Sequence, residues 1–159
     1  MEKKGFDQKI NNLNEKFQTL LSYLVRDAAI FVQGKLKEEI LNGEAGTDYP
    51  KSYPSSVTQG ATGFVGVVSG NLRNSMETDL TEIDKLTAIV YMDESIAAVA
   101  QYGRDLLDWT KQKYGFTFFE IVLALYSDFI LKTYQEAIQK FINQVSNGQI
   151  PTYSNPFPL

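Results

Sequence analysis

Apolar residues recur at steps of three and four near the N-terminal end of the chain, which is the spacing of one face of an α-helix. The pattern predicts a long amphipathic helix over residues 1–41, ended by Asn42 and Gly43. Lys35 interrupts the apolar stripe, whose members are Phe6, Ile10, Leu13, Phe17, Leu20, Leu24, Ala28, Phe31 and Ile40.

This predicted helix is too long for a compact chain of the same size. At 1.5 Å per residue it would measure roughly 50 Å, whereas a compact chain of 159 residues is about 40 Å across. We therefore expect it to bend, most readily at Gly34, or to protrude. Two arrangements stay open: a curved helix that lies on its own sheet, and a helix that also packs on a neighbouring subunit.

Residues 42–68 show little periodicity and hold two prolines and five glycines. A loop of this length in a compact domain is usually a functional arm or a disordered segment. Its glycines at 60, 63 and 66 do not match the spacing of a phosphate-binding loop. We therefore interpret residues 42–68 as a loop arm without a nucleotide site.

The pattern over residues 69–116 predicts a short segment that we call the stub (residues 69–76), followed by a hairpin and short helices. Ser69 is a suitable N-cap for a single helical turn, and residues 78–84 and 86–92 have strand-like composition with a tight turn at Asp84 and Lys85. A short helix capped by Asp93 is expected to run through Tyr102 and to end at Gly103. A further helical turn follows over residues 104–109.

The C-terminal part of the chain predicts a second long helix over residues 117–146, with an apolar face wide enough for a core and an interface. Prolines at 151, 156 and 158 then exclude helix or inner strand in residues 147–159. Disorder is the simplest expectation for such an end, but four apolar side chains favour an arm extended across a neighbouring subunit: Ile150, Tyr153, Phe157 and Leu159. The fold class predicted is α+β, with one domain over residues 1–146 and an arm over residues 147–159.

The amino-acid composition excludes several classes of catalytic and metal site. The chain has no cysteine and no histidine, which excludes disulfides, thiolate or imidazole metal ligands, and nucleophile arrangements that use either residue. Asp105 and Asp108 share a helix face and could run hydrolysis or hold a hard cation, but simple solvation explains them. We expect no catalysis, no metal and no cofactor. Because the most apolar stretch, residues 118–126, is short and includes Glu120, we expect neither a secretory signal nor a membrane span.

Charge is distributed unevenly along the chain, whose formal net charge is −4. Residues 1–41 hold seven basic and six acidic side chains, and residues 42–159 hold eight and thirteen. Such an acidic middle repels phosphate, so nucleic acid is an unfavourable main partner. The acidic cluster is either a solvated strand edge or an interface for a basic partner; its members are Glu77, Asp79, Glu82, Asp84, Asp93 and Glu94.

Two short motifs flank the predicted hairpin. The stub at residues 69–76 reads SGNLRNSM, and residues 97–103 read AAVAQYG. Together they resemble the tail-completion or neck protein family of long-tailed bacteriophages, also called virion morphogenesis or minor tail-component proteins. The matching positions are Ser69, Gly70, Leu72, Arg73, Ser75 and Met76 in the first motif, and Ala97, Val99, Gln101, Tyr102 and Gly103 in the second. After Gly103 the family commonly continues through an Arg-Pro-Phe segment, where this chain has RDLLDWTKQKYGFTFFE.

The resemblance implies a non-enzymatic structural protein at the head-to-tail junction of a virion, assembled in the host cytoplasm as a ring between portal-side and tail-side components. It implies a role for Arg73 as a fork that pairs a carboxylate or carbonyl groups within the subunit or across the ring. Leu72 and Met76 would seat the stub in the core. The alternative is a bacterial scaffold or adaptor that associates through its long helices. The interface candidates are Arg73, Leu72, Met76, Tyr102, Ile150, Tyr153, Phe157 and Leu159.

Overall fold

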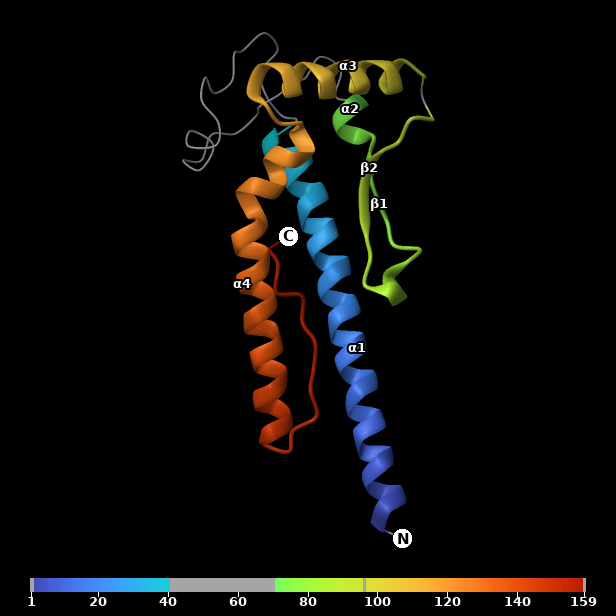
Figure 1. Ribbon diagram of the computed structural model, residues 1–159, viewed down its shortest axis with the longest axis vertical. Helices are drawn as coiled ribbons and strands as arrows, with labels where there is room; N and C mark the ends of the chain where they lie inside the picture. Colours follow the sequence, from blue (N-terminus) through green and yellow to red (C-terminus); the bar gives the residue numbers. More distant parts are fainter. Residues whose placement is uncertain (1, 41–70, 96, 159) are drawn as a thin grey trace.

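The computed structural model describes residues 2–40, 71–95 and 97–158. The predicted loop arm at 42–68 lies outside these residues, as do Ser69, Gly70 and Leu159. Two long helices and a small antiparallel hairpin make up an α+β fold (Figure 1). This is the predicted fold class.

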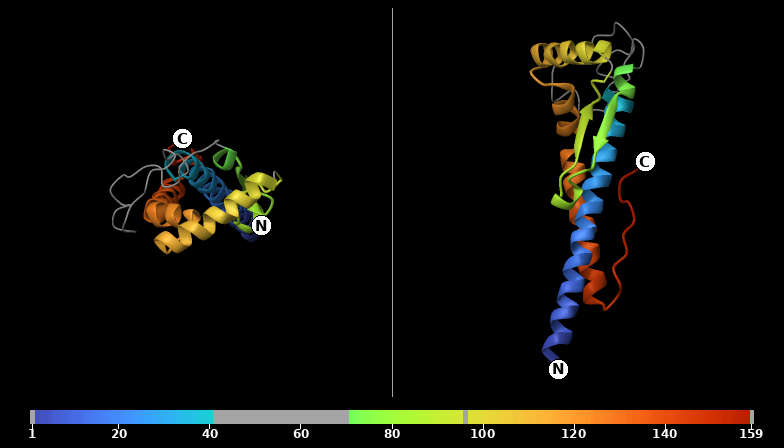
Figure 2. Two further views of the ribbon diagram at one scale, coloured as in Figure 1. Left: turned by 90° about the horizontal axis from the view of Figure 1, so that it is seen from above. Right: turned by 90° about the vertical axis from the view of Figure 1, so that its right-hand side faces the viewer.

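The N-terminal helix α1 spans Glu2–Lys35 and continues into a π-helical turn, Leu36–Ile40. The change of helix type begins two residues after Gly34, where the sequence predicted a bend, and a π-turn widens the helix locally. The C-terminal part of α1 and the π-helical turn carry the buried stripe, including Leu24, Phe31 and Leu36. Its N-terminal turns extend beyond the other described elements in Figure 1 and in the side view of Figure 2, so of the two expected outcomes the helix protrudes.

The C-terminal helix α4 spans Phe118–Ser146 and runs antiparallel to α1 (Figure 1). Thr117 starts it with a capping box: the Thr117 side chain accepts from the backbone N–H of Glu120, and the Glu120 carboxylate accepts from the N–H of Thr117. Buried side chains of α4, among them Phe118, Ile121 and Val122, form the main core with the C-terminal part of α1. A second cluster joins Leu20 and Leu24 to Phe141.

The hairpin pairs β1 (Met76–Asp79) with β2 (Ile89–Met92), and Met76 lies opposite Met92. One face packs on α1, where the Gln33 amide donates to the carbonyl oxygen of Met76 at 2.6 Å. The predicted strands were too long on both sides of the turn, because the Asp79 carboxylate accepts the N–H of Thr81 and turns the chain out of the ladder. A 3-10 turn at Ile83–Lys85 completes the connection, so the predicted tight turn was wrong.

Helix α2 (Asn71–Asn74) and helix α3 (Ala97–Tyr114) lie at one end of the molecule, and α3 crosses the ends of the long helices (Figures 1 and 2). The predicted helix end at Gly103 was wrong, because α3 continues through it. Gly103 is buried, and a Cβ there would meet the Sδ of Met92 and would lie 3.2 Å from Cδ1 of Leu72. This glycine permits close packing of α3 on the hairpin and α2, and does not stop the helix.

The arm at residues 147–158 has no helix or strand, as predicted. It turns back at the end of α4 and runs beside the two long helices of its own chain (Figure 1). The prediction that it extends across a neighbouring subunit is therefore corrected for Tyr153 and Phe157, because both side chains contact α1 of the same subunit. Ile150 stays 75% exposed.

Candidate functional site

A buried carboxylate on α1 anchors the arm. The Asp27 side chain is 3% exposed, and its two oxygens accept hydrogen bonds from different elements: Oδ1 from the Nε of Arg26 at 2.7 Å, and Oδ2 from the hydroxyl of Tyr153 at 2.6 Å. Burial of a carboxylate costs free energy unless the group is paired and hydrogen-bonded. Here Tyr153 of the arm donates one of the two hydrogen bonds described above. Burial, followed by the hydrogen bond to Asp27, raises the pKa of Tyr153 well above its usual range.

Aromatic rings surround this anchor. The rings of Tyr23 and Tyr153 lie 5.0 Å apart, and the Arg26 guanidinium lies 4.8 Å from the ring centre of Tyr23. The hydrogen bond to Asp27 is the main cause that raises the pKa of Arg26. The guanidinium therefore remains charged, and it balances the Asp27 carboxylate at the point where the arm crosses α1.

The second anchor of the arm is Phe157, which is almost fully buried. Its ring lies 5.4 Å from that of Phe31 on α1, and 6.1 and 6.2 Å from those of Phe129 and Tyr134 on α4. Such tilted and edge-on pairs add to the stabilisation from area burial. The arm is thus fixed to the long helices of its own subunit by two anchors, Tyr153 and Phe157, which are four positions apart in the sequence.

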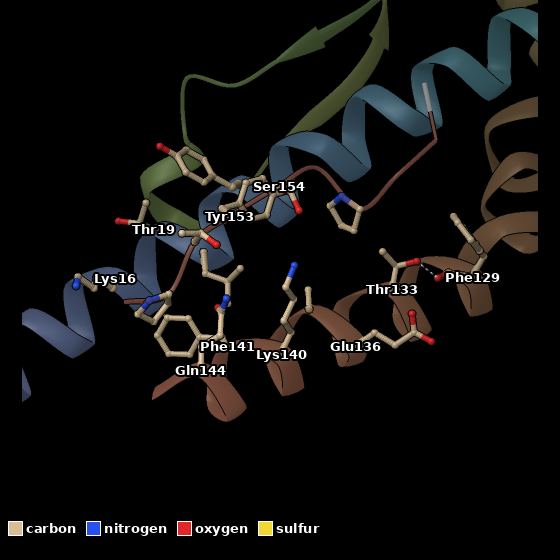
Figure 3. A pocket seen from close by; sticks show the side chains of 16 residues that line it. Lys16, Thr19, Phe129, Thr133, Glu136, Lys140, Phe141, Gln144, Tyr153 and Ser154 are labelled. Carbon is tan, nitrogen blue, oxygen red and sulfur yellow. Dashed lines mark hydrogen bonds between the residues drawn. The ribbon is translucent and has the colours of Figure 1, made fainter. Parts of the chain in front are cut away.

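Between the two anchors and the end of α4 lies a cavity of about 460 Å³ (Figure 3). Its lining includes the buried side chains of Leu20 and Phe141 and the exposed side chains of Lys16 and Lys140. The side-chain oxygen of Gln144, which lines the cavity, is buried and has no hydrogen-bond partner within the described part of the chain. Cavities of this size can take a small amphipathic molecule.

The N-terminal end of α1 is a first uncovered apolar surface. We call residues 5–16 the α1 overhang. Within it Ile10 is 49% and Leu13 is 38% exposed, although both continue the stripe that is buried further along the helix. Phe17 is the next stripe residue, and its ring lies 5.5 Å from that of Phe141 on α4. The amphipathic pattern of α1 therefore extends beyond the surface that this subunit provides.

A second uncovered surface lies on the hairpin. Residues opposite one another in the ladder share a face, so Glu77 with Tyr91 and Asp79 with Ile89 form the side that points away from α1. We call these four residues the hairpin outer face. Ile89 is 51% and Tyr91 is 42% exposed. This surface is apolar on β2 and acidic on β1.

The structure separates the predicted interface residues into different environments. Leu72 and Met76 are buried in the main core, which confirms their seating role but corrects their assignment to an interface. Arg73 is half-buried on α2, and an intersubunit role for it stays a prediction. Tyr102 lies in α3, but its side chain is outside the described part, as is Leu159.

Sequence reasoning missed Asp27, the residue that holds the arm. Its signal was present, because Asp27 lies three residues after Leu24 and four before Phe31, on the apolar stripe of the predicted helix. A charged residue at such a position needs a buried partner. Asp105 and Asp108, by contrast, are exposed on α3. No group of three or more acidic side chains within residues 2–40, 71–95 and 97–158 is placed to hold a metal ion.

None of the helices in the described part is both long and apolar enough to span a membrane. Comparisons with protein-family models, with curated proteins and with solved structures find no match.

Proposed function

We propose that this chain is a non-enzymatic structural protein that assembles into a ring, and that the ring belongs to the head-to-tail junction of a long-tailed bacteriophage. The observation that carries the first part is the pair of uncovered surfaces on one subunit, the α1 overhang and the hairpin outer face. The second part depends on the SGNLRNSM and AAVAQYG motifs, which resemble the neck and tail-completion family.

The geometry favours assembly because the overhang is a helix end whose apolar residues Ile10 and Leu13 stay largely exposed within the described part of the chain. Exposed large apolar side chains that continue a buried stripe mark an interaction surface. Packing on another protein supplies the missing contacts. In this proposal the neighbours are further copies of the chain, and portal-side and tail-side virion proteins bind the finished ring.

Measurement of mass in solution tests the proposal. The purified chain, of 17.9 kDa, is analysed by light scattering over a range of concentrations and imaged by negative-stain electron microscopy, alone and with candidate portal and tail proteins. A closed ring, or a monomer that forms a ring on a junction partner, is the expected result. A monomer in every mixture would overturn the proposal, and a two-fold dimer that binds no virion protein would favour the scaffold or adaptor alternative.

A further inference from the structure

We propose that the α1 overhang of one copy packs on the hairpin outer face of the next copy, so that each subunit contributes two different surfaces to one repeated contact. This inference rests on the proposed function, because a ring needs a contact of this head-to-tail kind. It goes further by naming the two surfaces. Each carries exposed apolar side chains: Ile10 and Leu13 on the overhang, and Ile89 and Tyr91 on the hairpin.

Charge favours this pairing. Lys9 and Lys16 are seven residues apart, so they lie on one flank of the Ile10 and Leu13 stripe, and both are exposed. Residues 76–94 hold six acidic side chains and a single lysine. Glu77 on the hairpin outer face is exposed beside Tyr91. In this contact the apolar stripe of the overhang packs on the apolar residues of β2, and its lysine flank lies beside Glu77 of β1. The two surfaces are therefore complementary in hydrophobicity and in charge.

The alternative of two overhangs that pair with each other is less favourable. In an antiparallel pair the flanks with Lys9 and Lys16 would face one another, which places like charges together. In a parallel pair the same lysines would face the flank that holds Asp7, Asn14 and Leu21, where the positions paired with Lys9 and Lys16 are the uncharged Asn14 and Leu21. The hairpin outer face is the better partner for the lysine flank.

A single subunit cannot bring the two surfaces together. Gln33 holds the start of β1 at Met76 through its side-chain hydrogen bond, and Tyr91 lies beside that position in the ladder. Leu13 is twenty residues earlier on the same helix, which is about 30 Å along the axis. The two surfaces also lie at different levels of α1 in Figure 1. A contact between Leu13 and Tyr91 must therefore join two copies.

The absence of cysteine from the sequence makes cross-linking a direct test. The double variant Leu13→Cys with Tyr91→Cys is treated with a short bis-maleimide, which tolerates more geometries than a disulfide, and is run on a denaturing gel. A ladder of multimers is expected. Each single variant alone should stay monomeric on the gel, and a mixture of the two single variants should give dimers and nothing larger.

Several results would overturn the inference. One is dimer formation by Leu13→Cys alone, which would show two overhangs side by side. Another is a ladder from the matched control Leu131→Cys with Tyr91→Cys, on the exposed side of α4, without one from the Leu13 pair. If light scattering shows rings while the Leu13 pair gives no ladder, the inference fails and the proposed function stands. If no ring forms under any condition, both fail.

Charge reversal provides an independent measurement. Lys9→Glu with Lys16→Glu should raise the concentration needed for assembly by about tenfold or more, and adding Glu77→Lys to that variant should recover part of the loss. The control Lys132→Glu with Lys140→Glu makes the same change in net charge on α4 and should have little effect. An equal loss in the control, or no recovery with Glu77→Lys, would contradict the proposed contact.

Discussion

The hydroxyl of Tyr153 donates to Oδ2 of Asp27 at 2.6 Å, across 126 positions of sequence. This bond connects the arm to the middle of α1 and supplies a partner to a buried carboxylate. Together with the ring contacts of Phe157, it makes the arm a part of the subunit's own fold. The sequence instead predicts that Tyr153 and Phe157 contact a neighbouring subunit.

Replacement of Tyr153 by phenylalanine should lower the free energy of unfolding by about 1 to 3 kcal/mol, because Asp27 then stays buried with Arg26 as its remaining partner. Urea unfolding of the monomer measures the change. The control is Tyr91→Phe on the hairpin outer face, where the ring is exposed. Equal stability of the wild-type and Tyr153→Phe proteins would show that the bond to Asp27 adds nothing to folding.

Alkaline pH should destabilise the arm. Because burial and Asp27 raise the pKa of Tyr153 in the folded state, the folded protein holds this proton more tightly than the unfolded chain, whose tyrosines titrate near pH 10. The stabilisation is therefore complete below about pH 10 and is lost as the pH rises above that value. Tyr134 is shifted in the same direction by burial, so the informative quantity is the difference between the wild-type and Tyr153→Phe proteins. Unfolding measured from neutral to alkaline pH should show a shallower decline in the variant.

Two glycines give a matched pair of substitutions with opposite signs. Gly103→Ala should cost about 1 to 3 kcal/mol, since its Cβ would enter the space of the buried Met92 side chain. Gly34→Ala should stabilise by about 0.5 to 1 kcal/mol, because a Cβ there meets nothing within 4 Å and alanine is the better helix former. Thermal and urea unfolding of both variants test this. Two changes of the same sign would contradict the packing role of Gly103.

Phe157→Ala should destabilise the subunit, but by about 2 to 3 kcal/mol, less than the 3 to 5 typical of a phenylalanine in a rigid core. The reason is that the whole arm can detach, so the loss cannot exceed the stabilisation that the docked arm provides. Deletion of residues 149–159 should then cost about as much as Phe157→Ala. A deletion without effect on the unfolding free energy would show that the arm does not contribute to the fold.

Amide hydrogen exchange should distinguish the overhang from the rest of α1. In the isolated monomer, residues 5–16 should exchange quickly, because Ile10 and Leu13 stay largely exposed within the described part of the chain. The same amides should become protected in the assembled ring, whereas those near Leu24 should be protected in both states. Slow exchange of residues 5–16 in the monomer would show that the overhang is stable without a neighbouring subunit.

The long elements could be predicted because their signals are repeated. Many apolar positions at steps of three and four define α1 and α4, and the Thr117 and Glu120 capping box marks the start of α4. Single-residue signals were less reliable. Gly103 suggested a helix end by local preference, but contact with Met92 requires a glycine inside α3. Asp79 was placed inside a strand, although its side chain ends that strand by binding the Thr81 amide.

The candidate site was predictable only in part. Apolar composition identified Tyr153 and Phe157 as side chains that need cover, but composition does not say which surface provides it. The arm's partners, Asp27 and Phe31, are more than a hundred positions away, and their proximity depends on how α1 and α4 pack. Asp27 was the available clue, since a carboxylate on an apolar stripe requires a partner from elsewhere in the chain.

The order of the elements along the chain also has a consequence for synthesis on the ribosome. Helix α1 is made before α4, which begins at Phe118, and before the arm, and these two elements cover much of its apolar stripe. At about 5 to 20 residues per second, the interval between Lys35 and Phe118 lasts roughly 4 to 17 seconds. During that interval the nascent chain leaves exposed the part of the apolar stripe that α4 and the arm cover in the folded subunit. Docking of the arm on α1 therefore comes after the synthesis of α4, when Tyr153 and Phe157 have left the exit tunnel.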